Sequence, residues 1–200
     1  MNTMDFKDWK WLNESKADIS EQEVAIHATG HTDWFCSPVP ESCGSLEPPV
    51  SSAPFFYTEV TGDFVFSAKV RPAHTDVFDA ATLMVIENES LWAKLAFETT
   101  DFGTNAAVCV VTNGVSDDAN GCDVEQDAVW LKIVRKGGVF STHYSLNGET
   151  YHMVRLFRLP VPETVKVGFG AQSPLGEGGM RFFSNVQLEH KTVENLRAGE

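Results

Sequence analysis

Apolar and polar residues alternate with a period of two along most of the chain, and no stretch repeats apolar residues at helical spacing over several turns. This alternation is typical of half-buried β-strands, so we expect an all-β protein with minor helix. Residues that favour turns separate the runs. The predicted strands are Phe55–Val60, Asp63–Arg71, Ala80–Glu87, Leu91–Thr99, Asn105–Thr112, Ala128–Lys136, Val139–Leu146, Thr150–Phe157, Val165–Gly170 and Arg181–Glu189.

The pair Asn147-Gly148 between two of these runs is typical of a two-residue hairpin turn, in which both central residues take positive φ. We expect it to connect two neighbouring antiparallel strands. Gly168 and Gly170 fall inside another predicted strand, where glycine indicates close backbone packing or a bulge.

Two segments do not alternate, and the C-terminal tail is polar. Ser37–Pro54 contains five prolines and Val115–Asp127 is rich in acidic residues, so both are expected to be long loops, where binding sites commonly lie. The polar tail His190–Glu200 is expected to fray or to form a short helix.

The number of strands indicates the architecture. About ten to twelve short strands are too many for a small immunoglobulin sandwich and fit a jelly roll of two packed antiparallel sheets. With 200 residues, we expect a single domain over residues 1–200.

Charge narrows the choice of partners. Lys and Arg number 15 against 28 Asp and Glu, which gives a formal net charge of -13 and a pI of about 4.8. Such a surface repels phosphate backbones and anionic lipids, so no nucleic acid or membrane partner is expected. The chain has neither a basic N-terminal region followed by an apolar run nor a long apolar span. We therefore expect a cytoplasmic protein.

Four cysteines are then expected to be thiols. Their spacing lacks a C-x-x-C pair and zinc-finger offsets, so no metal site and no cofactor are expected. Cys109 reads as a buried core thiol, and a bond between Cys36 and Cys43 would only tighten a loop; their redox state is left open. Cys122 is the fourth cysteine.

Several sequence blocks, in order along the chain, resemble the concanavalin A-like domain-of-unknown-function family that includes the yeast regulation of enolase protein. The resemblance covers about residues 9–189, leaves 190–200 as a C-terminal tail, and implies a concanavalin A-like jelly-roll sandwich with no settled activity. The chain departs from the family pattern at Ala80, Ile86 and Asp118, where the family usually has Gln, Arg and Trp. The main blocks are Trp11-Leu12-Asn13-Glu14, Thr32-Asp33-Trp34-Phe35, Val60-Thr61-Gly62-Asp63-Phe64, Asp79-Ala80-Ala81-Thr82-Leu83-Met84-Val85, Leu91-Trp92-Ala93-Lys94-Leu95-Ala96-Phe97-Glu98, Val110-Val111-Thr112 with Ser116-Asp117, Val129-Trp130-Leu131-Lys132 leading to Tyr144-Ser145-Leu146-Asn147-Gly148, and Val167-Gly168 with Ser173-Pro174.

One predicted strand carries a row of candidate binding residues. Alternation along Leu91–Thr99 places Trp92, Lys94 and Glu98 on one face, opposite an apolar core face. In a concanavalin A-like sandwich this face would be concave, and an indole, an ammonium and a carboxylate suit sugar recognition. The alternative is that Trp92 packs under a loop while Lys94 and Glu98 form a solvated pair.

Further residues are candidates for the same ligand site. Strand alternation brings Thr112, Met84 and Trp130 to this surface if the sheet order allows it. Asp79 and Asp33 fall in family blocks, although an Asp at a strand end commonly caps a turn instead.

Catalysis has weaker support. The chain lacks the Glu-x-Asp-x-x-Glu strand of laminarinase-like jelly rolls, and no serine-hydrolase, Walker or Rossmann motif is present. If the protein is an enzyme, a glycoside hydrolase or lyase is expected, with Glu98 as the first catalytic candidate and then Asp79 and His143. The Asp117–Asp127 segment has enough oxygen ligands for calcium, but it fails the EF-hand pattern and a solvated acidic loop is favoured.

Three functions therefore stay open. The first is a cytoplasmic carbohydrate- or metabolite-binding jelly roll with its site on the concave sheet. The second is a glycan-active enzyme on the same fold. The third, which only the family resemblance implies, is an interaction protein that modulates a metabolic enzyme.

Overall fold

The computed structural model describes residues 4–38, 49–73 and 75–200, and all ten predicted strands are present. Their ends differ from the predicted ends by a few residues at most. In the structure they are β6 (Phe55–Thr61), β7 (Phe64–Pro72), β8 (Ala80–Asn88), β9 (Leu91–Thr99), β10 (Asn105–Asn113), β12 (Val129–Lys136), β13 (Val139–Ser145), β14 (His152–Arg158), β15 (Thr164–Gln172) and β16 (Gly178–Glu189).

Six further strands were not predicted. One of them, β11, occupies most of the Val115–Asp127 segment, so the expectation of a loop there is wrong. Its residues have low strand propensity, but pairing with β10 satisfies their backbone groups all the same. The additional strands are β1 (Lys10–Leu12), β2 (Ala17–Ile19), β3 (Glu23–Thr29), β4 (Trp34–Phe35), β5 (Val50–Ser51) and β11 (Val115–Asp123).

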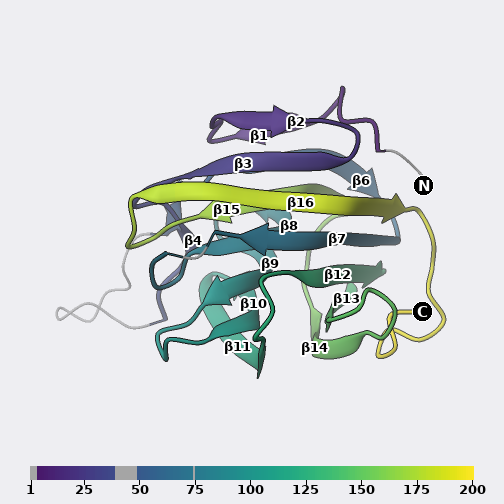
Figure 1. Ribbon diagram of the computed structural model, residues 1–200. Helices are drawn as coiled ribbons and strands as arrows, with labels where there is room; N and C mark the ends of the chain where they lie inside the picture. Colours follow the sequence, from purple (N-terminus) through teal and green to yellow (C-terminus); the bar gives the residue numbers. More distant parts are fainter. Residues whose placement is uncertain (1–3, 39–48, 74) are drawn as a thin grey trace.

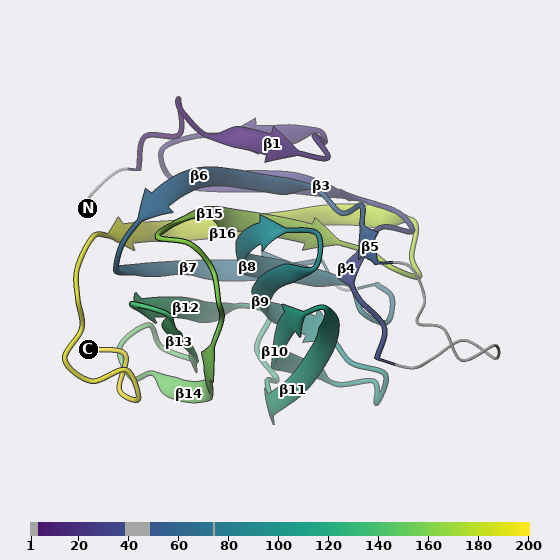
Figure 2. The ribbon, with the colours of Figure 1, turned by 180° about the vertical axis from the view of Figure 1, so that it is seen from behind.

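The strands form two seven-stranded antiparallel sheets that pack face to face, which confirms the concanavalin A-like jelly-roll sandwich (Figures 1 and 2). Sheet A has the order β1-β6-β15-β8-β9-β10-β11, and sheet B has the order β14-β13-β12-β7-β16-β3-β2. The short pair β4-β5 lies apart from both sheets. The described residues contain no helix, so the expectation of minor helix is wrong. The tail, expected to fray or to form a short helix, consists of turns and irregular chain over residues 190–200.

Aromatic residues fill the core between the sheets. The rings of Phe66 and Phe183 lie 5.4 Å and 4.6 Å from the ring of Phe169, and all three side chains are fully buried. Burying one such side chain stabilises a fold by about 1.5–3 kcal/mol. Gly168 beside them permits close strand packing, because a Cβ there would clash with the backbone of Phe56 and Tyr57.

The hairpin predicted at Asn147-Gly148 exists, but its turn is longer than two residues. Gly148 has φ +78°, whereas Asn147 does not take positive φ. Instead, the Asn147 side-chain oxygen accepts the backbone N–H groups of Glu149 and Thr150, both at 2.9 Å. Gly148 lies against the Trp130 ring, where an added Cβ would come within 2.8 Å. The side-chain bonds of Asn147 therefore replace a tight backbone turn.

A second apolar cluster covers part of the outer face of sheet A, the face turned away from the core. Trp34 on β4 packs edge-on against Trp92 on β9, with 6.2 Å between ring centroids. The Trp34 indole N–H donates to the carbonyl of Ala53 at 2.9 Å. The segment that contains β4 thus covers one part of this face of sheet A and leaves a hollow beside the covered part.

Among the described residues, no helix is long and apolar enough to cross a membrane.

Candidate functional site

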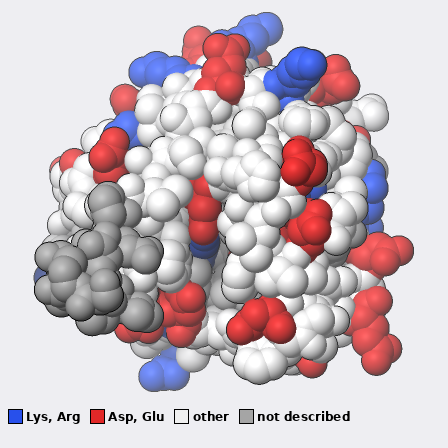
Figure 3. Space-filling model, turned by 90° about the vertical axis from the view of Figure 1, so that its left-hand side faces the viewer, with Lys and Arg blue, Asp and Glu red and all other residues white. Residues whose placement is uncertain are grey.

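A hollow of about 280 Å³ lies where the Asp33–Phe35 segment meets β9, β10, β11 and β15; we call it the acidic pocket. Figure 3 shows a narrow cleft on this side of the molecule, with acidic groups in red around a basic group in blue. Its buried floor consists of Lys94, Glu98, Thr100, Val108, Val110 and Gln172. Its walls and rim consist of Asp33, Phe35, Phe78, Asp101, Asp118 and Asn120.

Lys94 stands on the floor and is only 2% exposed. Its ammonium donates to the Asp33 carboxylate at 3.0 Å, the Trp34 carbonyl at 2.7 Å and the Gln172 side-chain oxygen at 2.9 Å. These three bonds use all three of its protons. Lys94 therefore fixes the β4 segment to the floor, and its charge is already compensated by Asp33.

Gln172 links Lys94 to Glu98. Its amide nitrogen donates to Glu98 Oε2 at 3.4 Å and to the Phe78 carbonyl at 3.1 Å. Among the described residues, Glu98 Oε1 has no hydrogen-bond partner, although Glu98 is only 8% exposed. The carboxyl group therefore has one oxygen available to a ligand in the pocket.

Burial raises the pKa of Glu98 to about 8, since it outweighs the opposing effect of the Lys94 ammonium. The carboxylates of Asp33, Asp118 and Asp101 raise the pKa further. At neutral pH the Glu98 side chain is thus a carboxylic acid, which can both donate and accept a hydrogen bond.

Phe78 forms part of the wall in a strained conformation. Its φ is +67°, in the left-handed region that bulky residues rarely adopt. The Phe78 N–H donates to the Thr99 carbonyl at 2.7 Å, and its own carbonyl accepts from Gln172. Backbone strain of this kind persists where the surrounding structure enforces it, and it is concentrated at functional sites.

Two rim carboxylates complete the pocket. Asp101 follows the end of β9, and Asp118 lies on β11. Partial burial raises the pKa of Asp118, as do Asp33 and Asp117, while Lys94 lowers it. The rim is thus acidic on two sides.

Three predicted ligand residues share the outer face of sheet A with Lys94 but do not line the pocket. Trp92 and Thr112 are fully buried, and Met84 is 1% exposed. The Trp92 indole N–H donates to the Glu89 carbonyl at 3.1 Å beneath Trp34. The expectation that Trp92 offers an open stacking face is therefore wrong, because the β4 segment covers it. Thr112 instead shares a hydroxyl hydrogen bond of 2.8 Å with Ser116.

Three other candidates lie elsewhere. Trp130 is on β12 in sheet B, where the Lys69 ammonium lies 4.5 Å from its ring centroid, so its predicted place beside Lys94 is wrong. Asp79 is fully buried in an ion pair of 3.1 Å with Arg181. His143 on β13 is also fully buried, and Gly199 of the tail lies against its ring.

The segment considered for calcium is mainly strand β11. Successive side chains on a strand point to opposite faces, so Asp117 and Asp118 diverge. Asp117 forms an ion pair of 3.1 Å with Arg155. Within the described ranges, no group of three or more His, Cys, Asp or Glu could hold a metal ion.

The described cysteines are free thiols. Cys109 is buried in the core as predicted, and burial raises its pKa to about 11. Cys36 is buried, and Cys122 is exposed. Cys43 lies outside the described residues, so the redox state of the Cys36 and Cys43 pair stays an expectation.

The acidic pocket also contains residues that the sequence interpretation missed. Gln172 extends the alternation of Gly168 and Gly170 by one further step, which could have revealed it. The sequence predicts a loop at Asp118 because its neighbours are poor strand formers. No local signal marks Phe78, whose position depends on contacts from distant parts of the chain.

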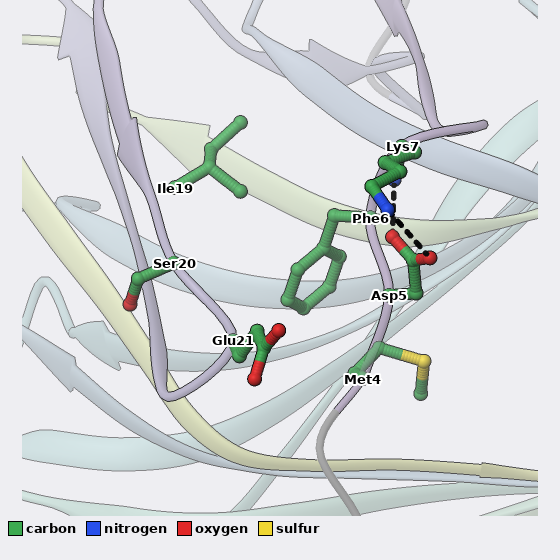
Figure 4. Close-up of a pocket in the computed structure, with 7 residues that line it drawn as sticks. All are labelled: Met4, Asp5, Phe6, Lys7, Ile19, Ser20 and Glu21. Atoms are coloured by element: carbon green, nitrogen blue, oxygen red, sulfur yellow. Dashed lines mark hydrogen bonds and ion pairs between the residues drawn. The ribbon is translucent and has the colours of Figure 1, made fainter.

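Another groove lies between the N-terminal segment and the β2–β3 turn, and Figure 4 shows the residues along it. Lys7 and Asp5 contact each other there, with exposed side chains. Ile19 on its other side is 43% exposed. Because none of the charged groups of this groove is buried, the groove lacks the chemistry of the acidic pocket.

Known proteins are similar to this chain in sequence and in fold. Regulation of enolase protein 1 of Saccharomyces cerevisiae is 28% identical over 178 residues, which cover 86% of this chain and 83% of the yeast protein. The crystal structure of a functionally unknown protein from Saccharomyces cerevisiae matches with a TM-score of 0.84 at 24% identity, covering 95% of this chain and 100% of that one.

More distant structures share the fold alone. The GH43 protein BlXynB of Bacillus licheniformis matches with a TM-score of 0.69 at 13% identity over 90% of this chain and 36% of that one. The exoplasmic/lumenal domain of VIP36, solved with Ca²⁺ and Man3GlcNAc, matches with a TM-score of 0.57 at 10% identity over 94% of this chain and 85% of that one.

A family model confirms the resemblance seen in the sequence blocks. It matches residues 11–191, which is nearly the whole chain. The chain belongs to the family described as protein of unknown function, DUF1349.

Proposed function

We propose that this protein binds a carbohydrate or a similar polyhydroxylated metabolite in the acidic pocket. The observation that carries the proposal is the Glu98 carboxyl group, which is buried on the pocket floor with one oxygen free of partners among the described residues. This oxygen is accessible to solvent in the pocket, and a ligand hydroxyl would take the place of water there.

The rest of the lining suits such a ligand. Asp118 and Asn120 provide acceptors and donors at the rim, and Phe35, Phe78 and Val108 provide apolar surface for the C–H groups of a sugar ring. Two proteins of similar fold support this choice of ligand class, since VIP36 was solved with Man3GlcNAc and BlXynB is a GH43 protein.

The proposal also concerns where the protein acts in the cell and what it binds. We expect the protein to act in the cytoplasm without a cofactor, with calcium at Asp117–Asp127 not favoured. The formal net charge of -13 disfavours nucleic acid and anionic membranes as partners. A metabolic enzyme as partner stays an expectation that rests on the name of the yeast relative.

Thermal denaturation with a panel of mono- and oligosaccharides, with and without calcium, tests the proposal. A ligand at a hundred times its Kd stabilises the native state by about 2.7 kcal/mol, which raises the midpoint of a chain of this size by about 5–10 °C. We expect this shift in the wild type and a smaller shift in Asn120→Ala and in Val110→Phe, which fills the hollow.

A matched control comes from the opposite side of the sandwich. Glu189→Gln changes an exposed residue of sheet B and should leave the shift intact. If no sugar raises the midpoint of the wild type, the proposed function is wrong. If Val110→Phe and Asn120→Ala keep the full shift, the sugar binds elsewhere and the assignment to the acidic pocket fails.

A second candidate function is a glycan-active enzyme, a glycoside hydrolase or lyase. The pKa of Glu98, raised to about 8 by burial, would keep this group protonated as a general acid at neutral pH, with Asp118 as a second carboxylate on the rim. This candidate predicts turnover of a bound oligosaccharide that Glu98→Gln abolishes. Binding without any product would exclude it for that ligand.

A further inference from the structure

We propose that the ligand of the acidic pocket carries a positively charged amino group next to Glu98, so that the site prefers amino sugars to neutral and acidic sugars. This inference rests on the proposed function and names the substrate class of the same site.

The balance of charges in the pocket is the first argument. Four carboxyl side chains line it, namely Asp33, Glu98, Asp101 and Asp118, against the single ammonium of Lys94. Lys94 and Asp33 compensate each other in an ion pair of 3.0 Å. Among the described residues, the other three carboxyl groups form no ion pair. Because Glu98 is protonated at neutral pH, the unbalanced negative charge of the pocket comes from Asp101 and Asp118, and it favours a cation.

The free oxygen of Glu98 offers a bound cation a direct contact. It belongs to a side chain that is more than nine-tenths buried and lines the pocket, and it has no hydrogen-bond partner among the described residues. At neutral pH this group is a carboxylic acid, and an ammonium bound beside it would stabilise the ionised carboxylate. The Lys94 ammonium does not donate to it, because its three protons go to Asp33, Trp34 and Gln172.

An organic ammonium fits this site better than a metal ion. A metal needs several ligands that converge on one point, and the described residues offer no group of three or more such side chains. The carboxyl groups of the pocket are instead spread between the floor and the rim. An ammonium needs only one or two acceptors, and the remaining rim groups would bind hydroxyls of the same ligand.

Binding should be coupled to loss of a proton. Glu98 is faced by Lys94 on its own strand, Gln172 on β15, Asp33 beside β4, Asp101 after β9 and Asp118 on β11. A bound ammonium adds a positive charge beside Glu98 and lowers the pKa of its carboxyl group from about 8. At pH 7 the bound protein then releases a proton to the buffer, whereas well above the pKa of Glu98 no proton remains to be released.

Calorimetric titration with three matched sugars tests the inference. Glucose, glucosamine and glucuronate share a pyranose ring and differ in charge. For the wild type at pH 7, we expect glucosamine to bind about tenfold more tightly than glucose, because a tenfold difference in affinity is the size expected of one modest charge interaction. We expect glucuronate to bind most weakly. Repeating the titration in buffers of different ionisation enthalpy should show proton release with glucosamine and none with glucose.

Two variants locate the preference. In Glu98→Gln the ratio of the glucosamine and glucose affinities should fall towards one, and the proton release should vanish. Asp118→Asn should lower the same ratio by a smaller factor, which keeps the test valid if Glu98→Gln does not fold. Glu189→Gln on sheet B should reproduce the wild-type ratio.

Each result has a distinct meaning. Equal affinity for glucose and glucosamine would overturn the inference while the proposed function stands. Tight binding of 2-aminoethanol and of glucosamine alike would support an ammonium site and contradict a preference for the sugar. Failure of all three sugars to bind would remove the proposed function and this inference together.

Discussion

The Lys94 ammonium lies 3.0 Å from the Asp33 carboxylate, although 61 residues separate them along the chain. The ion pair connects the floor of the acidic pocket to the segment that forms one of its walls. Because Lys94 also donates to the Trp34 carbonyl, this one side chain holds both the position of β4 and the cover over Trp92.

Replacing Lys94 with Met should therefore destabilise the fold. The change leaves the Asp33 carboxylate, the Trp34 carbonyl and the Gln172 side-chain oxygen without their donor, which should lower the free energy of unfolding by about 2–4 kcal/mol in urea denaturation. Lys10→Met is the control, because Lys10 forms an exposed ion pair of 3.7 Å with Glu59 and should cost less than about 0.5 kcal/mol. If the two substitutions lower the free energy of unfolding equally, Lys94 does not hold the β4 segment in place.

Glu98 should make stability depend on pH. Its pKa in the folded protein is about 8, above its ordinary value of 4.5, so folding takes up a proton between these two values. The free energy of unfolding should then fall as pH rises from about 6.5 to about 8, because below about 6.5 the opposite effect of His143 offsets that of Glu98. Glu98→Gln, which resembles the protonated form, should be more stable than the wild type at pH 9 and should lose this decline. A parallel decline in the variant would contradict the raised pKa of Glu98.

Arg181 should be essential to the structure next to the pocket. It is fully buried, pairs with Asp79 at 3.1 Å and donates to the carbonyls of Gln172 at 3.0 Å and Ala80 at 3.2 Å. Burial alone raises the pKa of Asp79, but hydrogen bonding to Ser173 and the Arg181 charge outweigh it and lower that pKa overall. Arg181→Met leaves the buried Asp79 carboxylate without its partner charge and should lower the free energy of unfolding by about 3–5 kcal/mol.

The double variant of this pair provides the check. Asp79→Leu combined with Arg181→Met removes both charges, so its loss of unfolding free energy should be smaller than that of Arg181→Met alone. A double variant that is less stable than Arg181→Met would refute the buried charge as the cause.

His143 should make the protein sensitive to acid. Burial, aided by the Lys132 ammonium, lowers its pKa from 6.5 to about 4. The neutral ring therefore contributes stability that is complete above about pH 6.5 and is lost as pH falls towards 4. Because Gly199 lies against the ring, hydrogen exchange should show the tail opening first in this range. Relative to the wild type, His143→Gln should gain stability as pH falls from about 6.5 to about 4, and a difference that does not change with pH would exclude this effect of His143.

Alternation along the chain predicted the fold because burial of one sheet face imposes a period of two. That signal is strong in β9, where Lys94 and Glu98 share a face as expected, and weak in β11, where polar residues occupy both faces. It also exists in β3, where Val24, Ile26 and Ala28 alternate with more polar positions but were not assigned to a strand.

The candidate site was only partly predictable from sequence for a physical reason. Period and residue type place Trp92 on the correct face, but its exposure depends on Trp34, which approaches from a segment far away in sequence. Phe78 and Gln172 likewise gain their roles from long-range hydrogen bonds. Local patterns therefore identify the face of the sheet on which a residue lies. The tertiary contacts that cover this face determine which of its residues can contact a ligand.

The most direct test of carbohydrate binding in the acidic pocket is an NMR titration of the ¹⁵N-labelled protein with glucose and, separately, with glucosamine. We predict saturable shifts of the amide signals of Lys94, Glu98, Asp118 and Gln172, larger for glucosamine at the same concentration. Unchanged spectra with both sugars, or shifts confined to the groove between Met4 and Glu21, would contradict it.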